Sequence, residues 1–206
     1  TLALGKARRF LDAAKAGHGG TLDPLATGIL PIAFGEATKT VSYAMDAKKS
    51  YAFEAIWGVA TTTDDQEGRV TETSDVRPAL SAIEGALSSF LGEIQQIPPQ
   101  YSAIKVDGER AYNLARANKG VDLKPRVVRV DRFERVNTDL GPDRAQFEVD
   151  CGKGTYIRSL VRDLARALGT CGHVATLRRT RCGPFNEKMA ISLDKLESLG
   201  HKAIGS

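Results

Sequence analysis

The segment GHGGTLDPLATG, residues 17–28, separates an N-terminal helical stretch from the strands that follow it. It contains four glycines and one proline, which is too many interruptions for a regular helix or strand. Because glycine carries no side chain, its backbone can approach a ligand closely, and Asp23 among these glycines is a candidate for chemistry. An alternative needs no chemistry: Asp23 followed by Pro24 is typical of a helix N-cap and first turn. Only residues 25–27 precede Gly28, however, and they leave little helix to be capped.

Outward from this segment, the spacing of apolar residues predicts a mixture of helices and strands. Leu4, Ala7, Leu11 and Ala14 recur at helical spacing, whereas residues 50–59 alternate as in a strand with one buried face. The strands fall into hairpin-like pairs rather than βαβ units, which predicts an α+β fold in one domain over residues 1–206. We expect helices over residues 2–16, 36–46 and 156–168, a short one just before residue 120, and one from Leu193. A further helix is expected from Pro78, with the apolar stripe Leu80, Ile83, Leu87 and Leu91. Strands are expected over residues 29–34, 50–59, 126–135, 144–151 and 173–179, and near Val70.

The composition is that of an ordinary soluble globular protein, with 42% hydrophobic and 26% charged residues in a chain of 206. No apolar run approaches the roughly 18 residues of a membrane span, and there is no signal-peptide pattern. The three cysteines, Cys151, Cys171 and Cys182, lack any CxxC spacing. A reducing, cytoplasmic compartment is therefore expected.

Positive charge is concentrated in the second half of the chain. Residues 101–135 carry nine Lys and Arg against five Asp and Glu, and residues 151–188 carry eight against two. The rest of the chain is acidic and includes a cluster at Asp64, Asp65 and Glu67. Because phosphates attract Lys and Arg, the basic regions favour a polyanionic partner such as a nucleic acid, although charge runs can also merely solvate a surface.

Few other residues suggest chemistry. His18 beside glycines is either an acid–base group or, more commonly, a structural residue. Arg158 and Arg162 share a face of the helix over 156–168, and they either solvate that face or place Arg158 in a cleft to hold a carboxylate or phosphate. Tyr51 is by default a core or interface residue. No metal-ligand spacing, P-loop, GxGxxG or Gly-x-Ser-x-Gly motif occurs, so no metal or nucleotide cofactor is expected.

Four blocks of sequence together resemble the bacterial tRNA pseudouridine-55 synthases, the TruB family. GHGGTLDPLATG with GEATK at 35–39 resembles the catalytic motif of the family, and KGTYIRSL at 153–160 with Asp163-Leu164 resembles its second signature. IPPQYSAIK at 97–105 resembles the segment before an RNA-gripping thumb. His173-Val174 with LRR at 177–179 resembles the last motif. The blocks occur in the family's order and span nearly the whole chain.

The resemblance implies a role for each matching residue. Asp23 matches the catalytic aspartate, and Arg158 matches the arginine that pairs with it. Tyr51 matches an active-site tyrosine that stacks on the target base and is a candidate for removing its C5 proton. His18 matches a histidine that fills the space left by the flipped nucleotide, and Leu177 matches an apolar wall of the pocket. Further substrate contacts are expected from Gly19, Leu22, Lys39, Lys105, Arg110, Arg116, Tyr156, Arg178 and Arg179.

The implied fold is the pseudouridine synthase fold, a mixed and mostly antiparallel sheet with flanking helices and a central cleft. The implied reaction turns a uridine in the T loop of tRNA into pseudouridine without a redox change, so it requires no cofactor. The expected partner is the T arm of tRNA, with no membrane, and a monomer is expected. A carboxylate suits this reaction as a nucleophile or a base, and the target must flip out of its stack.

The sequence also departs from the family pattern. Family members begin with a strand carrying Lys-Pro-x-Gly-x-Thr-Ser, and many carry a C-terminal PUA domain. We therefore expect residues 1–206 to be the catalytic domain without that strand and without that domain, with the thumb insertion at about 95–125. Three alternatives remain: a catalytically silent tRNA-binding or folding protein, a glycoside-type hydrolase that would need a second carboxylate, and a guide-RNA-dependent relative that shares the aspartate motif.

Overall fold

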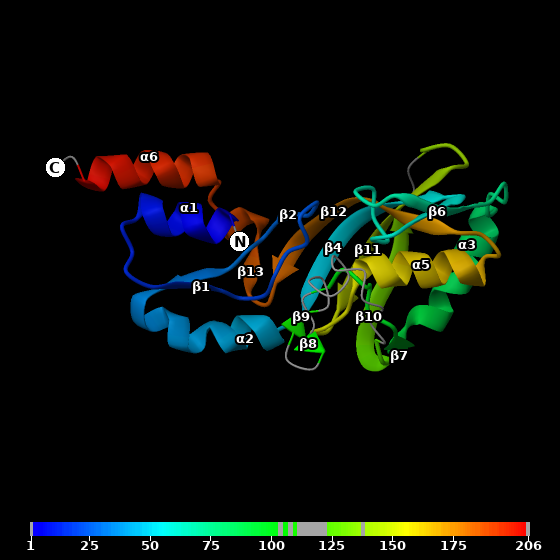
Figure 1. The fold of residues 1–206 in the computed structure, drawn as a ribbon, viewed down its shortest axis with the longest axis horizontal. Helices are drawn as coiled ribbons and strands as arrows, with labels where there is room; N and C mark the ends of the chain where they lie inside the picture. The colour runs from blue at the N-terminus through cyan, green and yellow to red at the C-terminus, as the bar shows by residue number, and fades with distance from the viewer. Residues whose placement is uncertain (1, 103–104, 107–108, 111–122, 137–138, 205–206) are drawn as a thin grey trace.

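The computed structural model describes residues 2–102, 105–106, 109–110, 123–136 and 139–204, and it confirms the α+β class. Its centre is a twisted, mostly antiparallel sheet (Figure 1). Neighbouring strands pair antiparallel, except that β2 pairs parallel with β12. Among the described residues the sheet has seven strands: in spatial order β13 (Phe185–Asn186), β12 (Gly172–Cys182), β4 (Lys49–Trp57), β11 (Arg144–Cys151), β10 (Arg126–Val136) and β7 (Gly92–Gln96), with β2 (Thr27–Gly28) beside β12.

The remaining elements surround this sheet. Within the described ranges, three short antiparallel pairs join β1 (Ala16–His18) to β3 (Ile32–Phe34), β5 (Val59–Thr61) to β6 (Val70–Thr73), and β8 (Lys105–Val106) to β9 (Glu109–Arg110). The α-helices of these ranges are α1 (Leu2–Phe10), α2 (Val41–Asp46), α3 (Leu80–Leu87), α5 (Ile157–Ala167) and α6 (Leu193–Ile204), and the 3₁₀ helices are η1 (Gly35–Thr40), η2 (Ser88–Phe90) and η3 (Glu187–Met189).

The core lies between one face of the sheet and the helices α5 and α3. On β4, the alternation places Phe53, Ala55 and Trp57 on the buried face. Phe53 stacks on Phe147 of β11, with ring centroids 5.5 Å apart. The face of α5 that carries Leu160 and the other apolar residues of its stripe is fully buried against these strands. The predicted strand over 50–59 and the predicted helix over 156–168 are therefore confirmed.

Several predicted boundaries were wrong near the N-terminus. The helix expected over 2–16 ends at Phe10, and Asp12 follows with a positive φ of 45°, which no helix can continue through. Residues 16–18 then form strand β1 instead of irregular structure. Of the strand expected over 29–34, only residues 32–34 pair in a sheet. Helices α1 and α6 lie side by side at one end of the molecule (Figure 1).

The helix predicted from Pro78 exists, but its apolar stripe is buried only in the middle. Ile83 and Leu87 are buried, whereas Leu80 and Leu91 are exposed. Leu80 is the first residue of α3, and Leu91 follows η2, so both lie beyond the part of the helix that packs on the sheet. The short basic helix expected before residue 120 lies outside the described residues.

The glycine-rich segment is attached to the central sheet through Gly28. Thr27 and Gly28 pair with Arg178 and Arg179 of β12, and the Ile29 amide donates to the Arg179 carbonyl at 2.8 Å. A Cβ atom on Gly28 would lie 2.2 Å from that carbonyl oxygen, and its φ of 97° also favours glycine. Glycine at this position therefore lets the loop approach β12. In the described part of the chain, no helix is both long and apolar enough to cross a membrane.

Replacing Leu160 with alanine should lower the free energy of unfolding by about 2–5 kcal/mol, because the side chain is fully buried and its removal leaves a cavity. The control, Leu80→Ala, removes the same atoms from a residue that is 55% exposed and should cost well under about 1 kcal/mol. Urea unfolding of the two variants measures the difference. Equal losses would show that the buried face of α5 is wrongly placed.

Candidate active site

Asp23 lies in a tight turn and caps no helix. The Ala26 amide donates to the Asp23 carbonyl at 3.0 Å, which closes a four-residue turn, and strand β2 follows directly. Leu25 and Ala26 pack against the hydrophobic core and so fix the turn on the sheet. The helix-cap interpretation is therefore wrong. The Asp23 side chain remains 26% exposed and can be reached from solvent.

Arg158 holds the Asp23 carboxylate with two parallel hydrogen bonds. Its Nε donates to one carboxylate oxygen at 2.8 Å and its Nη2 donates to the other at 3.0 Å. Arg158 is the second residue of α5 and its side chain is only 3% exposed, so it does not solvate the helix surface. Two-point contact of this kind fixes the plane of the carboxylate as well as its position.

A second carboxylate, that of Asp65, shares the same guanidinium. Arg158 Nη1 lies 3.4 Å from an Asp65 oxygen and donates to the Thr63 carbonyl at 2.8 Å. Asp65 is 2% exposed, and its carboxylate also accepts hydrogen bonds from the Thr63 hydroxyl and the Glu67 amide. The preceding residue, Asp64, has a φ of 59°, a conformation that a non-glycine residue adopts at some cost. These contacts hold the Asp65 carboxylate in the interior beside Arg158.

Asp65 was not predicted as a site residue, because Asp64, Asp65 and Glu67 were interpreted only as an acidic cluster. A signal was present: two adjacent acids, Asp64 and Asp65, match two arginines one helical turn apart. In the structure Arg162 binds Asp64 at 3.1 Å, while Arg158 binds Asp65. Burial raises the pKa of Asp64, and the nearby Arg162 opposes that rise.

The N-terminal end of α5 is also fastened to residues 96–101, which lead toward β8 and β9. Gln96 accepts from the Tyr156 amide at 2.8 Å and donates to the Tyr156 carbonyl at 3.1 Å. Ser159 donates to the Ile97 carbonyl at 2.9 Å, and Arg158 Nη2 donates to the Tyr101 carbonyl at 2.9 Å. Arg158 therefore joins three separate parts of the chain around Asp23.

Tyr51 lies on β4 with its ring packed against the core. Its register neighbours are Val149 on β11 and Arg179 on β12. Burial raises the pKa of the Tyr51 hydroxyl to about 12, while the Arg179 guanidinium beside it acts in the opposite direction. Tyr51 is therefore a neutral phenol at physiological pH.

The other residues expected to contact the substrate differ in how far they are exposed to solvent. Tyr156 lies at the start of α5, where burial raises its pKa and the Asp23 carboxylate contributes to the rise. Leu177, on β12 opposite Phe53, is 5% exposed and belongs to the core.

The two arginines that follow Leu177 on β12 differ in exposure. Arg178 is half exposed and bound to Glu187 and Thr27, so a phosphate could reach it. Arg179 is 1% exposed and donates to backbone carbonyls, so its position does not agree with the expected contact to RNA.

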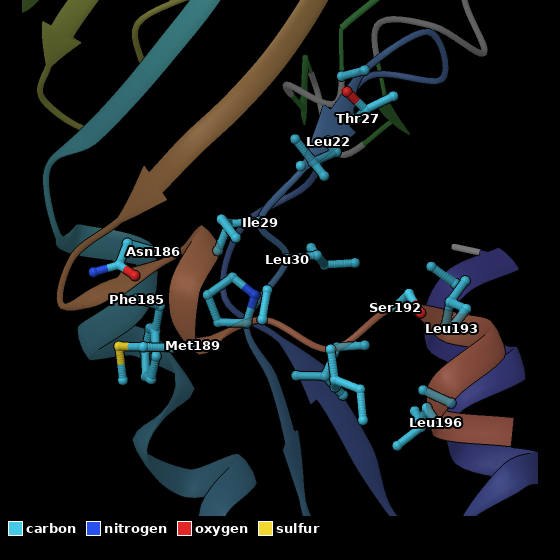
Figure 2. Close-up of a pocket in the computed structure, with 18 of the residues that line it drawn as sticks. Leu22, Thr27, Ile29, Leu30, Phe185, Asn186, Met189, Ser192, Leu193 and Leu196 are labelled. Atoms are coloured by element: carbon cyan, nitrogen blue, oxygen red, sulfur yellow. The ribbon is translucent and has the colours of Figure 1, made fainter. Parts of the chain in front are cut away.

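The other residues of the first motif that were expected to contact the substrate lie in different parts of the structure. Gly19 is buried and a Cβ atom there would lie 2.6 Å from Ala44, so it serves close packing. His18 lies on β1 opposite Ile32, and Lys39 is exposed on η1 and paired with Glu36. Leu22 lines an apolar cavity of about 520 Å³, whose lining includes no Asp23, Tyr51 or Arg158. Figure 2 shows Leu22 among the lining residues, which also come from α6 and the segment after β13.

Three basic residues of the expected thumb are described only in part. Lys105 and Arg110 are register partners in the β8–β9 hairpin. Arg116 lies outside the described residues. In the part of the chain that the structure covers, no three His, Cys, Asp or Glu side chains are grouped as metal ligands.

Two family models together match nearly the whole chain. A family model described as TruB family pseudouridylate synthase (N terminal domain) matches residues 8–157, and one described as tRNA pseudouridylate synthase B C-terminal domain matches residues 158–203. The chain belongs to the TruB family. Both members of the Asp23–Arg158 pair lie within the matched residues, one in each model.

Relatives named tRNA pseudouridine synthase B match nearly the whole chain. The relative from Caulobacter sp. (strain K31) is 57% identical over 98% of this chain and 65% of its own length. The relative from Rhodospirillum rubrum is 58% identical over 95% and 63%, and that from Gluconacetobacter diazotrophicus is 61% identical over 93% and 62%. The chain thus spans less than two thirds of the length of these TruB family relatives.

Solved structures of related fold agree with the TruB family assignment. The chain is similar to one in the crystal structure of a Cbf5-Nop10-Gar1 complex, with a TM-score of 0.75 and 31% identity over 98% of this chain and 52% of that one. A chain from the archaeal box H/ACA sRNP Nop10-Cbf5 complex gives 0.71 and 30%, over 100% and 51%. The predicted pseudouridine synthase fold is confirmed.

Replacing Arg158 with methionine should lower the free energy of unfolding by about 3–5 kcal/mol, because it leaves buried acceptors, including Asp65, without their cation. The matched control is Arg132→Met. Arg132 also pairs with three carboxylates, but its side chain is 38% exposed, and each exposed pair contributes at most about 1 kcal/mol. Urea unfolding compares the two variants. A larger loss for Arg132→Met would contradict the burial of the Arg158 network.

Proposed function

We propose that this protein isomerises a uridine in the T loop of tRNA, at position 55, to pseudouridine. One observation carries the proposal: Asp23 of the family motif is a partly exposed carboxylate held at both oxygens by buried Arg158. Such a carboxylate has a fixed orientation and an open side, as attack on a substrate requires. Membership of the TruB family supports the same reaction.

The reaction breaks the bond between N1 of uracil and C1′ of ribose, turns the base, and forms a bond between C5 and C1′. The proton on C5 is lost and N1 gains one, so atoms and electrons balance without a cofactor. The Asp23 carboxylate is suited to attack C6 of the base or C1′ of the ribose, or to remove a proton from C2′. The target uridine must first flip out of its stack, which costs a few kcal/mol. Stacking on Tyr51 would recover about 1–3 kcal/mol of that cost.

We propose that residues 1–206 act as the catalytic domain, with a thumb at about 95–125 that grips RNA. The hydrogen bonds from Gln96, Ser159 and Arg158 to the segment before β8 support this assignment, because they tie the base of the insertion to Asp23. Exposed arginines such as Arg126 and Arg129 on β10 could contact the phosphates of the T arm. We further propose that the protein acts as a monomer in the cytoplasm, where its buried, unpaired cysteines would remain reduced.

The decisive experiment incubates the natural full-length protein with unmodified tRNA and maps pseudouridine by nucleotide. We expect product at the T-loop uridine and no requirement for an added cofactor or guide RNA. Binding of tRNA without product would support the silent tRNA-binding protein instead. Release of free uracil would support a glycoside hydrolase, and activity only with a guide RNA would support the guide-dependent class. Each of these outcomes would overturn the proposal.

Asp23→Asn should abolish turnover while tRNA affinity changes little, because the amide keeps the shape of the carboxylate but loses its charge. We expect the single-turnover rate to fall by at least about 10³-fold, the scale seen when an essential catalytic group is removed. The control is Asp75→Asn, an exposed carboxylate outside the site, which should leave the rate unchanged. Near-normal turnover of Asp23→Asn would remove Asp23 from the chemistry.

Replacing Lys105, Arg110 or Arg116 with alanine should mainly weaken tRNA binding. For each phosphate that the variant no longer neutralises, the slope of log affinity against log salt should become shallower by about 0.7–0.9. Filter binding at several salt concentrations measures the slope, with Lys195→Ala on the exposed surface of α6 as the control. A loss of turnover at saturating tRNA would instead assign these residues to the chemistry.

A further inference from the structure

We propose that Arg179 is a positioning residue for the reaction. Its buried side chain holds the backbone of the loop that carries Asp23, residues 20–29, next to Tyr51, and it does not contact RNA. The inference deepens the proposed function and rests on it. It starts from an unusual location: Arg179 is among the largest fully buried side chains of the described structure, at 1% exposure. Its neighbour Arg178, at 52% side-chain exposure, has the location expected of a phosphate contact.

The guanidinium of Arg179 binds the backbone of the loop on both sides of Asp23. Its Nε donates to the Ile29 carbonyl at 2.8 Å. Its Nη1 and Nη2 donate to the carbonyls of Thr21 and Gly20 at 3.3 and 3.2 Å. The planar fork of arginine makes this possible, because one rigid group reaches three acceptors in fixed directions. A single side chain therefore joins the two ends of the loop that carries Asp23.

The main chain of Arg179 makes an additional contact with the same loop. Its carbonyl accepts from the Ile29 amide at 2.8 Å, and Gly28 approaches so closely that a Cβ atom there would lie 2.2 Å away. Because β12 is a central strand of the sheet, this attachment transfers the rigidity of the sheet to the loop. Arg158 fixes the carboxylate of Asp23, whereas Arg179 fixes the backbone on either side of it.

The charge of Arg179 has a second consequence. Among the ion pairs of the described residues Arg179 has no carboxylate partner, unlike Arg158, which has two. Its cross-strand neighbour is Tyr51. Burial raises the pKa of the Tyr51 hydroxyl, whereas the adjacent Arg179 cation acts in the opposite direction and favours the ionised phenol. The Arg179 cation is therefore placed to stabilise negative charge that develops at the Tyr51 hydroxyl.

The test separates the fork of Arg179 from its charge with two variants. Arg179→Lys keeps the charge but cannot span three carbonyls, and Arg179→Met removes both. The matched control is Arg181→Met on the same strand, where the side chain is 43% exposed and binds Ser50 and Asp150. For each variant, the natural full-length protein is assayed for the single-turnover rate at saturating tRNA, tRNA affinity, and amide hydrogen exchange of residues 20–29.

We expect Arg179→Met to lower the single-turnover rate by at least tenfold with tRNA affinity within threefold of the unmodified protein, and to speed exchange in residues 20–29. Arg179→Lys should speed exchange in the same residues but retain more turnover than Arg179→Met, since its charge still lies beside Tyr51. It is also the milder change, and it serves as the test variant if Arg179→Met fails to fold. Arg181→Met should change none of the three measurements.

Two results would overturn the proposal. A loss of affinity with normal turnover at saturating tRNA would make Arg179 an RNA contact. Unchanged exchange in residues 20–29 for both Arg179 variants would show that the side chain does not hold the loop. If the unmodified protein forms no pseudouridine, the proposed function fails and the catalytic role of Arg179 fails with it. The exchange measurement would still report on loop attachment, so the two failures are distinguishable.

Discussion

The structure of the site depends on one buried cation. Arg158 donates hydrogen bonds to Asp23 and to the carbonyls of Thr63 and Tyr101, and Asp65 lies beside it as a second anion. A guanidinium with so little exposure is stable only if its charge and its N–H groups are satisfied. The chain meets this need with partners from three separate segments, so the packing of α5 on the sheet and the geometry of Asp23 cannot vary independently.

This arrangement meets two separate requirements of the catalytic role proposed for Asp23. The carboxylate has to be held rigidly, and it must also stay accessible. Arg158 approaches Asp23 from the protein interior and leaves the side chain 26% exposed. Arg158 has a second anionic partner in Asp65, so its charge does not depend on Asp23 alone. Arg179 supports the same loop through backbone carbonyls and not through another carboxylate.

The apolar cavity beneath Leu22 is separate from this site. It lies between the glycine-rich segment, α1 and the residues from β13 to α6 (Figure 2). Leu22 and Asp23 are adjacent in sequence, yet Leu22 lines this cavity, whereas Asp23 is not among its lining residues and pairs with Arg158.

The sequence by itself determined the α+β class, the long strands and helix α5, and it singled out Asp23 and Arg158, which the structure pairs. Periodicity is a local property, and long amphipathic elements such as α5 display it over several turns. Short elements such as β1 carry too few residues to show it, so that strand was missed. Only the tertiary structure revealed the burial of Arg179 and the roles of Asp65 and Gln96. These depend on contacts between residues far apart in the sequence, such as Asp23 and Arg158, which are 135 positions apart. They also depend on burial, because a buried charged group must find a partner, whereas a charged group on the surface is solvated by water.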